Sequence, residues 1–317
     1  MNNQSNSSLT ELNDKLLAGK AALEQSEIDD LIINLRIELS RAVNSNQLAN
    51  EPDAEQWQNI FDGLFSSELA APFMENMDKD LFFGFGEYLG SFTDQPNNRI
   101  VSIIHNYLNL FRTSSFLQKI YDERRWDKLI HTLIVKSHYT FDVLFNQRVN
   151  QYKKKSLFRI IKDSNTIDYS WQKTSDIVSS YRSSISHILF EIESQNKIVA
   201  FLLENSLEMV MLDLACLTSG IVNAMIPANS VSEHISYILN QTKAPILFAD
   251  DEKQLAKIRS IKKETPFLKT VVMLKGNAAE DWVISFEEFK ALASDHSIKT
   301  DVLIKPDSLA TLMYTSG

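Results

Sequence analysis

The second half of the sequence alternates short apolar runs with amphipathic segments. The run at 198–203 is continuously apolar, as in a strand that is covered on both faces of a parallel sheet. A helical segment at 207–219 follows, and Gly220 is placed to end it. The same succession then repeats, with strand-length runs at 221–226, 245–249, 270–274 and 309–314. This alternation predicts an α/β fold with a doubly wound, mainly parallel sheet that binds ligands at the carboxyl ends of its strands.

Three helix starts are marked by the spacing of a capping box, in which a serine is followed three residues later by an acidic residue. The pairs are Ser26 with Asp29, Ser230 with Glu233, and Ser285 with Glu288. We therefore expect a helix to begin at each of these serines.

The first 140 residues or so carry a different pattern, in which apolar side chains recur at helical intervals. Ile100, Ile103 and Tyr107 belong to the clearest of these stripes. Residues 1–25 are polar and predict a mobile end or a frayed helix. The sequence therefore predicts a flexible segment at 1–25, an α-helical region of unknown role at 26–144, and the α/β region at 145–317.

Two patterns in the helical region imitate ligand sites. Gly84, Gly86 and Gly90 have the spacing GxGxxxG, without the strand–turn–helix unit that a dinucleotide fingerprint requires. They predict local packing or a kink between helices. His131 and His138 lie seven residues apart, but no neighbouring Cys or carboxylate completes a set of metal ligands. They are interpreted as structural histidines.

Composition limits the partners of the chain. Its net charge of −9 disfavours a broad nucleic-acid surface and favours small-molecule chemistry. Cys216 is the only cysteine, which excludes an internal disulfide framework and suits a reducing cytoplasm. The apolar stretch at 209–226 is long enough to span a bilayer, but it contains Asp213 and is broken at Gly220. It predicts a buried helix followed by a buried strand, and the N-terminus has no features of a signal peptide.

Strand-like runs at 157–161 and 167–171 predict a hairpin that turns at 163–165. A basic run lies beside it, made of Arg148, Lys153, Lys154, Lys155 and Arg159. The run is either a solvated linker face or a contact for acidic phospholipid or a phosphate-bearing substrate. Its shortness and the acidic total charge favour the solvated face. The second alternative would make this cytoplasmic protein peripheral at the inner face of a membrane.

The last residues of the chain predict the start of a phosphate-binding loop. The apolar run at 309–314 predicts a buried strand, and Thr315, Ser316 and Gly317 follow it directly. Small hydroxylated residues and a glycine in this position allow backbone N–H groups to face a bound anion. For Tyr314, anchoring the strand end in the core and contacting the ligand directly are both open.

Four segments within 145–317 resemble those of the acyl-adenylate-forming enzymes, and they occur in the order found in that family. They are the Tyr169-Ser170-Trp171 strand before a helix, the unit from Ile198 through Asn205 and Glu208 to Gly220, the helix and strand at 231–239 and 245–248, and Tyr314-Thr315-Ser316-Gly317. The family includes fatty acyl-CoA synthetases, luciferases and peptide-synthetase adenylation domains. The long-chain fatty acyl-CoA synthetases look most similar, and the helical first 140 residues depart from the usual family pattern.

The resemblance implies a ligase that uses Mg-ATP and coenzyme A. A carboxylate, here a fatty acid, would form an acyl-adenylate and pyrophosphate, and the thiol of coenzyme A would then take the acyl group. The resemblance places Tyr314, Thr315, Ser316 and Gly317 at the ATP phosphates. It implies no catalytic residue and no metal ligand in these 317 residues, because the family's catalytic lysine and its adenine, ribose, Mg²⁺ and acyl positions come later. We therefore expect the front part of a longer enzyme, inactive alone.

Two other functions are compatible with the same residues. One is another adenylating ligase, which would transfer the acyl group to a carrier protein. The other is non-catalytic, with the helical region acting as a partner-binding or membrane-docking module on a defective adenylation fragment. The sequence gives neither the acyl chain length nor the oligomeric state.

Overall fold

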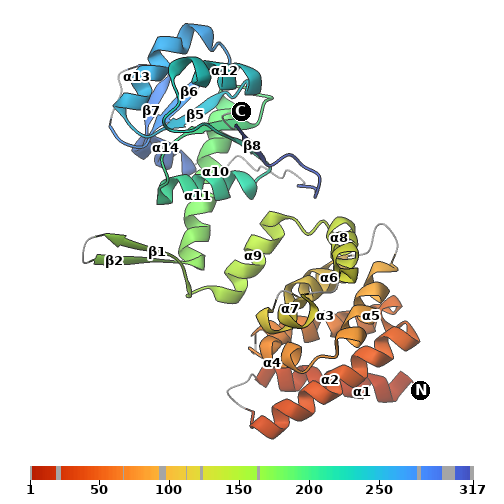
Figure 1. The fold of residues 1–317 in the computed structure, drawn as a ribbon. Coiled ribbons are helices and arrows are strands. Elements are labelled where there is room, and N and C mark those ends of the chain that lie inside the picture. Colours follow the sequence, from red (N-terminus) through yellow and green to blue (C-terminus); the bar gives the residue numbers. More distant parts are fainter. Residues whose placement is uncertain are drawn as a thin grey trace. The chain divides into compact units, whose positions relative to one another are not determined.

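The computed structural model of the chain describes residues 2–18, 23–66, 68–92, 98–111, 113–121, 124–162, 165–276, 280–294 and 304–314. The chain divides into two compact units, Met1–Tyr139 and Thr140–Gly317, which are drawn in Figure 1. The division falls slightly before the boundary that the sequence suggested between residues 144 and 145. Each unit has its own buried side chains and is described separately.

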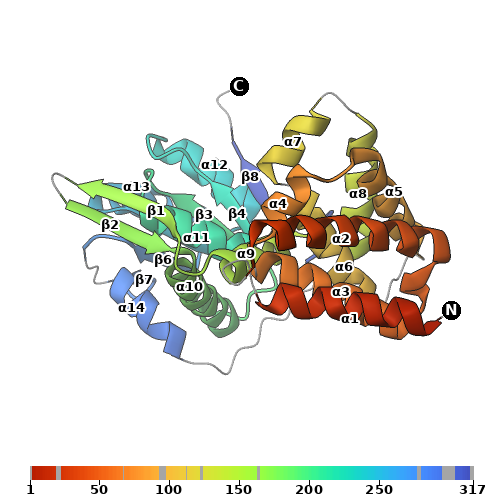
Figure 2. The same ribbon diagram turned by 90° about the horizontal axis from the view of Figure 1, so that it is seen from below.

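The first unit is helical throughout its described residues. Its α-helices are α1 (Asn2–Ala18), α2 (Gln25–Ser45), α3 (Glu51–Ser66), α4 (Ala70–Glu75), α5 (Lys79–Gly90), α6 (Asn98–Phe111), α7 (Ser114–Ile120) and α8 (Arg125–Ser137), with a 3₁₀ turn at Gln47–Ala49. Helix α3 packs against α1 and α6, and α5 packs against α2 and α8. Figure 2 shows α1, α2 and α3 lying together. The predicted helical region is confirmed.

The N-terminal segment forms a helix. Helix α1 covers Asn2–Ala18, and its Leu9, Leu12 and Leu16 are almost fully buried. These leucines recur every three or four residues, so one narrow apolar stripe is enough to hold the helix against α3. Of the two alternatives predicted for residues 1–25, a mobile end or a frayed helix, the structure shows a helix at Asn2–Ala18.

The N-cap of helix α2 lies two residues before Ser26, the serine of the predicted capping box. Glu24 is the N-cap, and its carboxylate pairs with the N3 backbone while Glu27 accepts a hydrogen bond from the Glu24 N–H at 2.9 Å. A glutamate thus performs the capping that was assigned to Ser26 with Asp29. The predicted pairing is wrong, although the helix is present.

Gly84, Gly86 and Gly90 all lie in α5, which continues through the first two and ends at Gly90. A Cβ on Gly86 would lie 2.3 Å from the hydroxyl oxygen of Tyr107. Tyr107 is fully buried, and its hydroxyl donates a hydrogen bond to the carbonyl of Phe82. The prediction of local packing is confirmed at Gly86, where the missing side chain allows α6 to approach.

The second unit combines helices with two sheets. Its α-helices are α9 (Phe141–Tyr152), α10 (Trp171–Glu191), α11 (Leu207–Leu217), α12 (Ser232–Thr242), α13 (Glu252–Ile261) and α14 (Phe286–Ala291), and its strands are β1 (Ser156–Lys162), β2 (Asn165–Ser170), β3 (Ile198–Leu202), β4 (Val222–Met225), β5 (Ile246–Ala249), β6 (Thr270–Met273), β7 (Val283–Ser285) and β8 (Thr311–Met313). Strands β1 and β2 form the predicted antiparallel hairpin. Short 3₁₀ turns follow α13 and α14.

The larger sheet has the strand order β7-β6-β5-β3-β4-β8, and its pairings are parallel. The chain places β4 on one side of β3 and then crosses to place β5 on the other side. The direction of winding therefore changes beside β3, and in α/β sheets a crevice forms at such a switch point.

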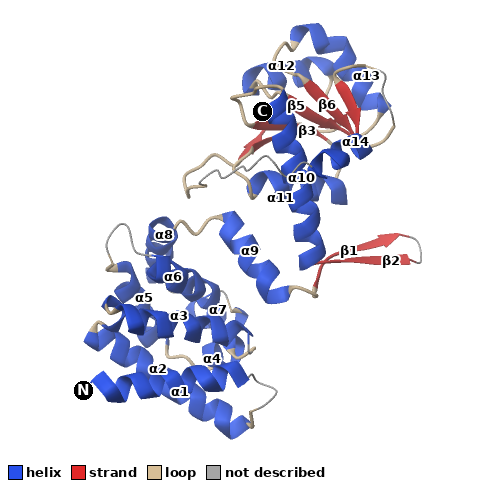
Figure 3. Ribbon diagram, turned by 180° about the vertical axis from the view of Figure 1, so that it is seen from behind, coloured by secondary structure: helices blue, strands red, loops and turns tan. Residues whose placement is uncertain are grey.

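Helices cover both faces of this sheet, as Figure 3 shows. On one face, Phe201 and Phe248 pack with residues of α10, α11 and α14. On the other face, Leu202 and Leu247 pack with residues of α12 and α13. Because successive side chains of a strand point to opposite faces, the apolar runs supply both cores at once. The predicted α/β fold with a doubly wound, mainly parallel sheet is confirmed.

Strand β8 differs from its prediction. It occupies an edge of the sheet and pairs with β4, and the side chain of Met313 is 78% exposed while the neighbouring Leu309 is 56% exposed. An apolar run has the same sequence signature in an edge strand and in a central strand, because periodicity does not reveal the number of neighbours. The expectation of a buried strand at 309–314 is wrong.

The other two predicted capping boxes, at Ser285 and Ser230, have different outcomes. Helix α14 begins with the predicted capping box of Ser285 and Glu288. Helix α12 has Val231 as its N-cap, with no side-chain capping bond, so the box predicted at Ser230 is wrong. Ser230 instead donates its backbone N–H to the carbonyl of Pro227 at 2.9 Å, which makes it part of the preceding turn.

The stretch at 209–226 forms helix α11 followed by strand β4, as predicted. Met211, Leu212 and Ala224 within it are almost fully buried in the α/β unit. Among the described residues, no helix has both the length and the apolar character needed to cross a membrane.

Candidate functional site

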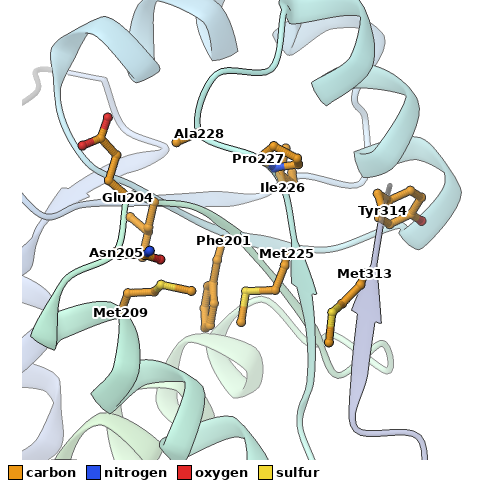
Figure 4. A pocket seen from close by; sticks show the side chains of 11 residues that line it. Phe201, Glu204, Asn205, Met209, Met225, Ile226, Pro227, Ala228, Met313 and Tyr314 are labelled. Carbon is orange, nitrogen blue, oxygen red and sulfur yellow. The ribbon is translucent and has the colours of Figure 1, made fainter. Parts of the chain in front are cut away.

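A cavity of about 590 Å³ opens at the carboxyl ends of β3, β4 and β8. It lies beside β3, where the winding of the sheet changes direction. Figure 4 shows side chains from these strands, from α11 and from the loop after β4 arranged around it. A volume of this size is typical of small-molecule sites, which occupy roughly 300–1,000 Å³.

One side of the cavity is apolar. Phe201, Met225 and Met313 are register partners on β3, β4 and β8, so their side chains emerge on the same face of the sheet. Met209 of α11 lies beside Phe201 and Met225 in Figure 4. Three methionines make this lining adaptable in shape, because the unbranched thioether side chain has several accessible conformations.

The other side of the cavity carries polar groups. Glu204 and Asn205 follow β3, and Tyr314 follows β8. Ser206 caps α11 by accepting a hydrogen bond from the Met209 N–H at 3.1 Å, which fixes the turn that presents Glu204 and Asn205. Partial burial raises the pKa of the Tyr314 phenol, with a smaller contribution from Tyr237. The phenol is therefore neutral at physiological pH and can donate a hydrogen bond.

Asp250 holds the polar rim in position. It follows β5, its side chain is buried, and its Oδ2 accepts a hydrogen bond from the Glu204 backbone N–H at 2.5 Å. This bond joins the residue after β5 to the second residue after β3, across neighbouring strands. Sequence reasoning did not identify Asp250. Its position directly after the buried run 245–249 was the available signal, because polar residues at the carboxyl ends of parallel strands meet at one edge.

The loop after β4 is fixed by two side chains of α13. Gln254 Nε2 donates to the carbonyl of Ala228 at 2.8 Å, and Lys257 Nζ donates to the carbonyl of Ser230 at 2.9 Å. Ala228 lines the cavity, so α13 determines the shape of that wall. The sequence did not reveal either contact, because both connect residues far apart along the chain.

A polar pair, made of the buried Asn223 and the half-buried Asp213, lies on the sheet near the edge strand. Asn223 of β4 donates from Nδ2 to Oδ1 of Asp213 on α11. Burial raises the pKa of Asp213 above its ordinary value of 3.8, and burial also raises the pKa of the nearby Cys216 thiol, with Asp213 adding to that rise. Cys216 is therefore a protonated, buried thiol and not a nucleophile.

This pair gives the folded chain a specific pH dependence. A carboxyl with a raised folded-state pKa adds stability that is fully present below the unfolded value of 3.8 and is lost as pH rises through the raised value. The stability of the chain therefore falls as pH rises between these two values. We expect Asp213→Asn to remove the contribution of Asp213 to this fall, because asparagine does not titrate. Urea unfolding of the unaltered chain and of the variant, from below pH 3.8 to neutral pH, measures the difference in the free energy of unfolding. The other carboxylates titrate in both chains, so parallel stability curves would contradict the prediction.

The structure places one of the four sequence-predicted phosphate residues at the cavity, namely Tyr314. Thr315, Ser316 and Gly317 lie outside the described residues. His131 is exposed on α8, and His138 is the left-handed C-cap of that helix. Within the described ranges, no group of three or more His, Cys, Asp or Glu side chains is arranged to hold a metal ion.

Comparison with known proteins finds a match between residues 145–317 and the family described as AMP-binding enzyme. A long-chain-fatty-acid–CoA ligase of Xenopus laevis is 29% identical over 119 residues, which cover 36% of this chain and 16% of that protein. Another of Mus musculus is 24% identical over 159 residues, which cover 47% of this chain and 23% of that protein. The chain thus spans less than a quarter of the length of these curated relatives.

Two solved structures are similar to part of the chain. The anthranilate CoA ligase AuaEII in complex with anthranoyl-AMP is 17% identical, with a TM-score of 0.43 over 56% of this chain and 32% of that chain. Coronafacic acid ligase from Pectobacterium brasiliense is 14% identical, with a TM-score of 0.45 over 55% of this chain and 33% of that chain.

Proposed function

The chain belongs to the AMP-binding enzyme family, and on this premise we propose that it takes part in activating a carboxylate with ATP and transferring the acyl group to coenzyme A. The observation that carries the proposal is the match of residues 145–317, which includes every strand of the parallel sheet and the cavity at its carboxyl edge. The fold, the position of the cavity and the matched family support the same reaction class.

In the proposed reaction, a carboxylate oxygen attacks the α-phosphorus of ATP, and the bond to the β-phosphate oxygen breaks to release pyrophosphate. The coenzyme A thiol then loses its proton, its sulfur attacks the acyl carbon, and AMP leaves with the bridging oxygen. The protein's main contribution to such a step is to position the phosphates and offset their charge.

We assign the phosphate contacts to Tyr314, Thr315, Ser316 and Gly317. The location of Tyr314 at the cavity, beside the carboxyl ends of β3 and β4, supports this assignment. Hydroxyls and backbone N–H groups following a strand suit phosphate oxygens, and a glycine allows the backbone to approach closely. Mg²⁺ would offset phosphate charge when bound. We assign it no residue of the described chain, in which no three His, Cys, Asp or Glu side chains are grouped to hold a metal ion.

For the carboxylate, we propose a long-chain fatty acid. The support is the names of three curated relatives from Xenopus laevis, Drosophila melanogaster and Mus musculus, each a long-chain-fatty-acid–CoA ligase. The apolar wall of Phe201, Met209 and Met225 is compatible with such a substrate. A cytoplasmic location is part of the proposal, since the single cysteine, Cys216, is buried and unpaired.

The proposal is tested by pyrophosphate release with ATP and carboxylates of increasing chain length, with and without coenzyme A. The assay compares the 317-residue chain with the complete translated product of its gene. We expect the complete product to release pyrophosphate in a carboxylate-dependent way and to make acyl-CoA. We expect the 317-residue chain alone to release none, since we assign it no catalytic residue.

The assay also separates the alternative functions. A product that releases pyrophosphate but does not use coenzyme A would indicate transfer to another acceptor, such as a carrier protein. A complete product that releases no pyrophosphate with any carboxylate would overturn the proposed function. Turnover by the 317-residue chain alone would overturn the assignment of no catalytic residue to it.

A further inference from the structure

Three consecutive lysines, Lys153, Lys154 and Lys155, form an exposed turn between α9 and β1, here called the lysine turn. The turn is held firmly by backbone hydrogen bonds. Trp171 N donates to the Lys155 carbonyl at 3.1 Å, and Gln172 N donates to the Lys153 carbonyl at 3.0 Å. The start of α10 therefore fixes the backbone of the lysine turn, and the three lysine side chains are exposed.

The region around the lysine turn has a charge opposite to that of the chain. Residues 148–173 contain seven Lys or Arg and two Asp, whereas the whole chain has a net charge of −9. Arg159 is paired with Asp168 on the hairpin, at 2.7 Å between Nε and Oδ1. In the described part of the chain, no carboxylate lies within ion-pair distance of a lysine of the turn. Lys155 Nζ lies 5.1 Å from the centroid of the Tyr152 ring, and all three lysines are exposed, so the positive charge of the turn can still reach a partner.

The β1–β2 hairpin next to the lysine turn projects from the rest of its unit, as Figures 1 and 3 both show. Ile161 is 74% exposed and Ile167 is 50% exposed. Ile161 pairs with Thr166, and Ile167 pairs with Ile160, so the two exposed isoleucines lie on opposite faces of the hairpin. Whichever face meets a surface therefore carries one exposed apolar side chain.

We propose that the lysine turn and the β1–β2 hairpin dock the chain on the surface of an anionic phospholipid membrane. Lysine ammonium groups act as mobile point charges, which suit a surface of many dispersed phosphates better than one shaped phosphate site. Exposed isoleucines on a projecting hairpin add apolar contact at the lipid interface. This inference does not depend on the proposed adenylation reaction, because the lysine turn does not line the cavity.

The test measures partition of the 317-residue chain onto vesicles by co-sedimentation. We expect binding to vesicles of phosphatidylcholine mixed with phosphatidylglycerol, and weak binding to phosphatidylcholine alone. The variant K153E/K154E/K155E should lower partition onto the anionic vesicles by about a hundredfold, since each lysine near such a surface contributes about a fivefold factor. Raising the salt concentration should weaken binding of the unaltered chain in the same direction.

A matched control makes the same change in net charge elsewhere in the α/β unit. K253E/K263E/K269E reverses three other exposed lysines and should retain most of the binding. Thermal unfolding of both variants confirms that each is folded. Equal losses in the two variants would show a general charge effect and overturn the proposal. Equal binding of the unaltered chain to both kinds of vesicle would also overturn the proposal. Binding to neither kind would overturn it too, and would indicate that the lysine turn contacts an acidic protein or is only solvated.

Discussion

Replacing Gly86 with alanine is expected to destabilise the helical unit by about 3 kcal/mol. The new Cβ would lie 2.3 Å from the Tyr107 hydroxyl oxygen and 2.8 Å from Leu129 Cδ2. Tyr107 cannot yield easily, because its ring stacks on Phe82 at 4.4 Å and its hydroxyl donates to the Phe82 carbonyl at 2.9 Å. The better helix propensity of alanine offsets only about 1 kcal/mol of this loss, so overpacking decides the sign.

Gly84 in the same helix provides the matched control. Apart from its chain neighbours and the nearby backbone of α5, no described heavy atom lies within 4 Å of a Cβ placed on it, so Gly84→Ala should stabilise the unit by about 0.5 to 1 kcal/mol. Urea unfolding followed by circular dichroism measures both variants, and hydrogen exchange of residues 79–90 locates the effect in α5. Effects of the same sign and size at the two glycines would contradict the packing at Gly86.

Replacing Asp250 with alanine is expected to cost about 2 to 3 kcal/mol and to loosen the polar rim of the cavity. The buried Oδ2 accepts the Glu204 N–H at 2.5 Å, and alanine would leave that donor without its acceptor. Glu204 and Asn205 line the cavity, so the loss of order falls on the candidate site itself. Thermal unfolding and hydrogen exchange of the segment 203–206 measure the two consequences.

Asp250→Asn separates the hydrogen bond from the charge. Asparagine keeps an oxygen that can accept the Glu204 N–H, so we expect less than half of the destabilisation caused by alanine. The exchange rates of the segment 203–206 should stay near those of the unaltered chain. If asparagine were as damaging as alanine, the Asp250–Glu204 hydrogen bond would not be what holds the rim.

Much of the fold was predictable because its signals are local. The strands at 198–202 and 246–249 and the helix at 207–217 follow the predicted runs to within a few residues. The capping box of Ser285 and Glu288 was correct because both partners lie within one turn. The box at Ser230 failed because a competing backbone bond to Pro227 places that serine in the preceding turn.

The candidate site was predictable only in part. Tyr314 was identified because it ends an apolar run beside a small, hydroxylated segment. Asp250, Gln254 and the register of Phe201 with Met225 were not identified, because each matters through a partner on another strand or helix. Such partners become neighbours only when the crossovers have set the strand order.

The sequence by itself determined the succession of strands and helices, the α/β class and the family, because periodicity, caps and motif order are written along the chain. Only the tertiary structure decided that β8 lies at an edge with Met313 exposed, and that Asp250 holds the backbone of Glu204 beyond the end of β3. The physical reason is that burial and hydrogen bonding depend on neighbours distant in sequence. An apolar run records that a strand forms, but the order of the sheet determines what covers it.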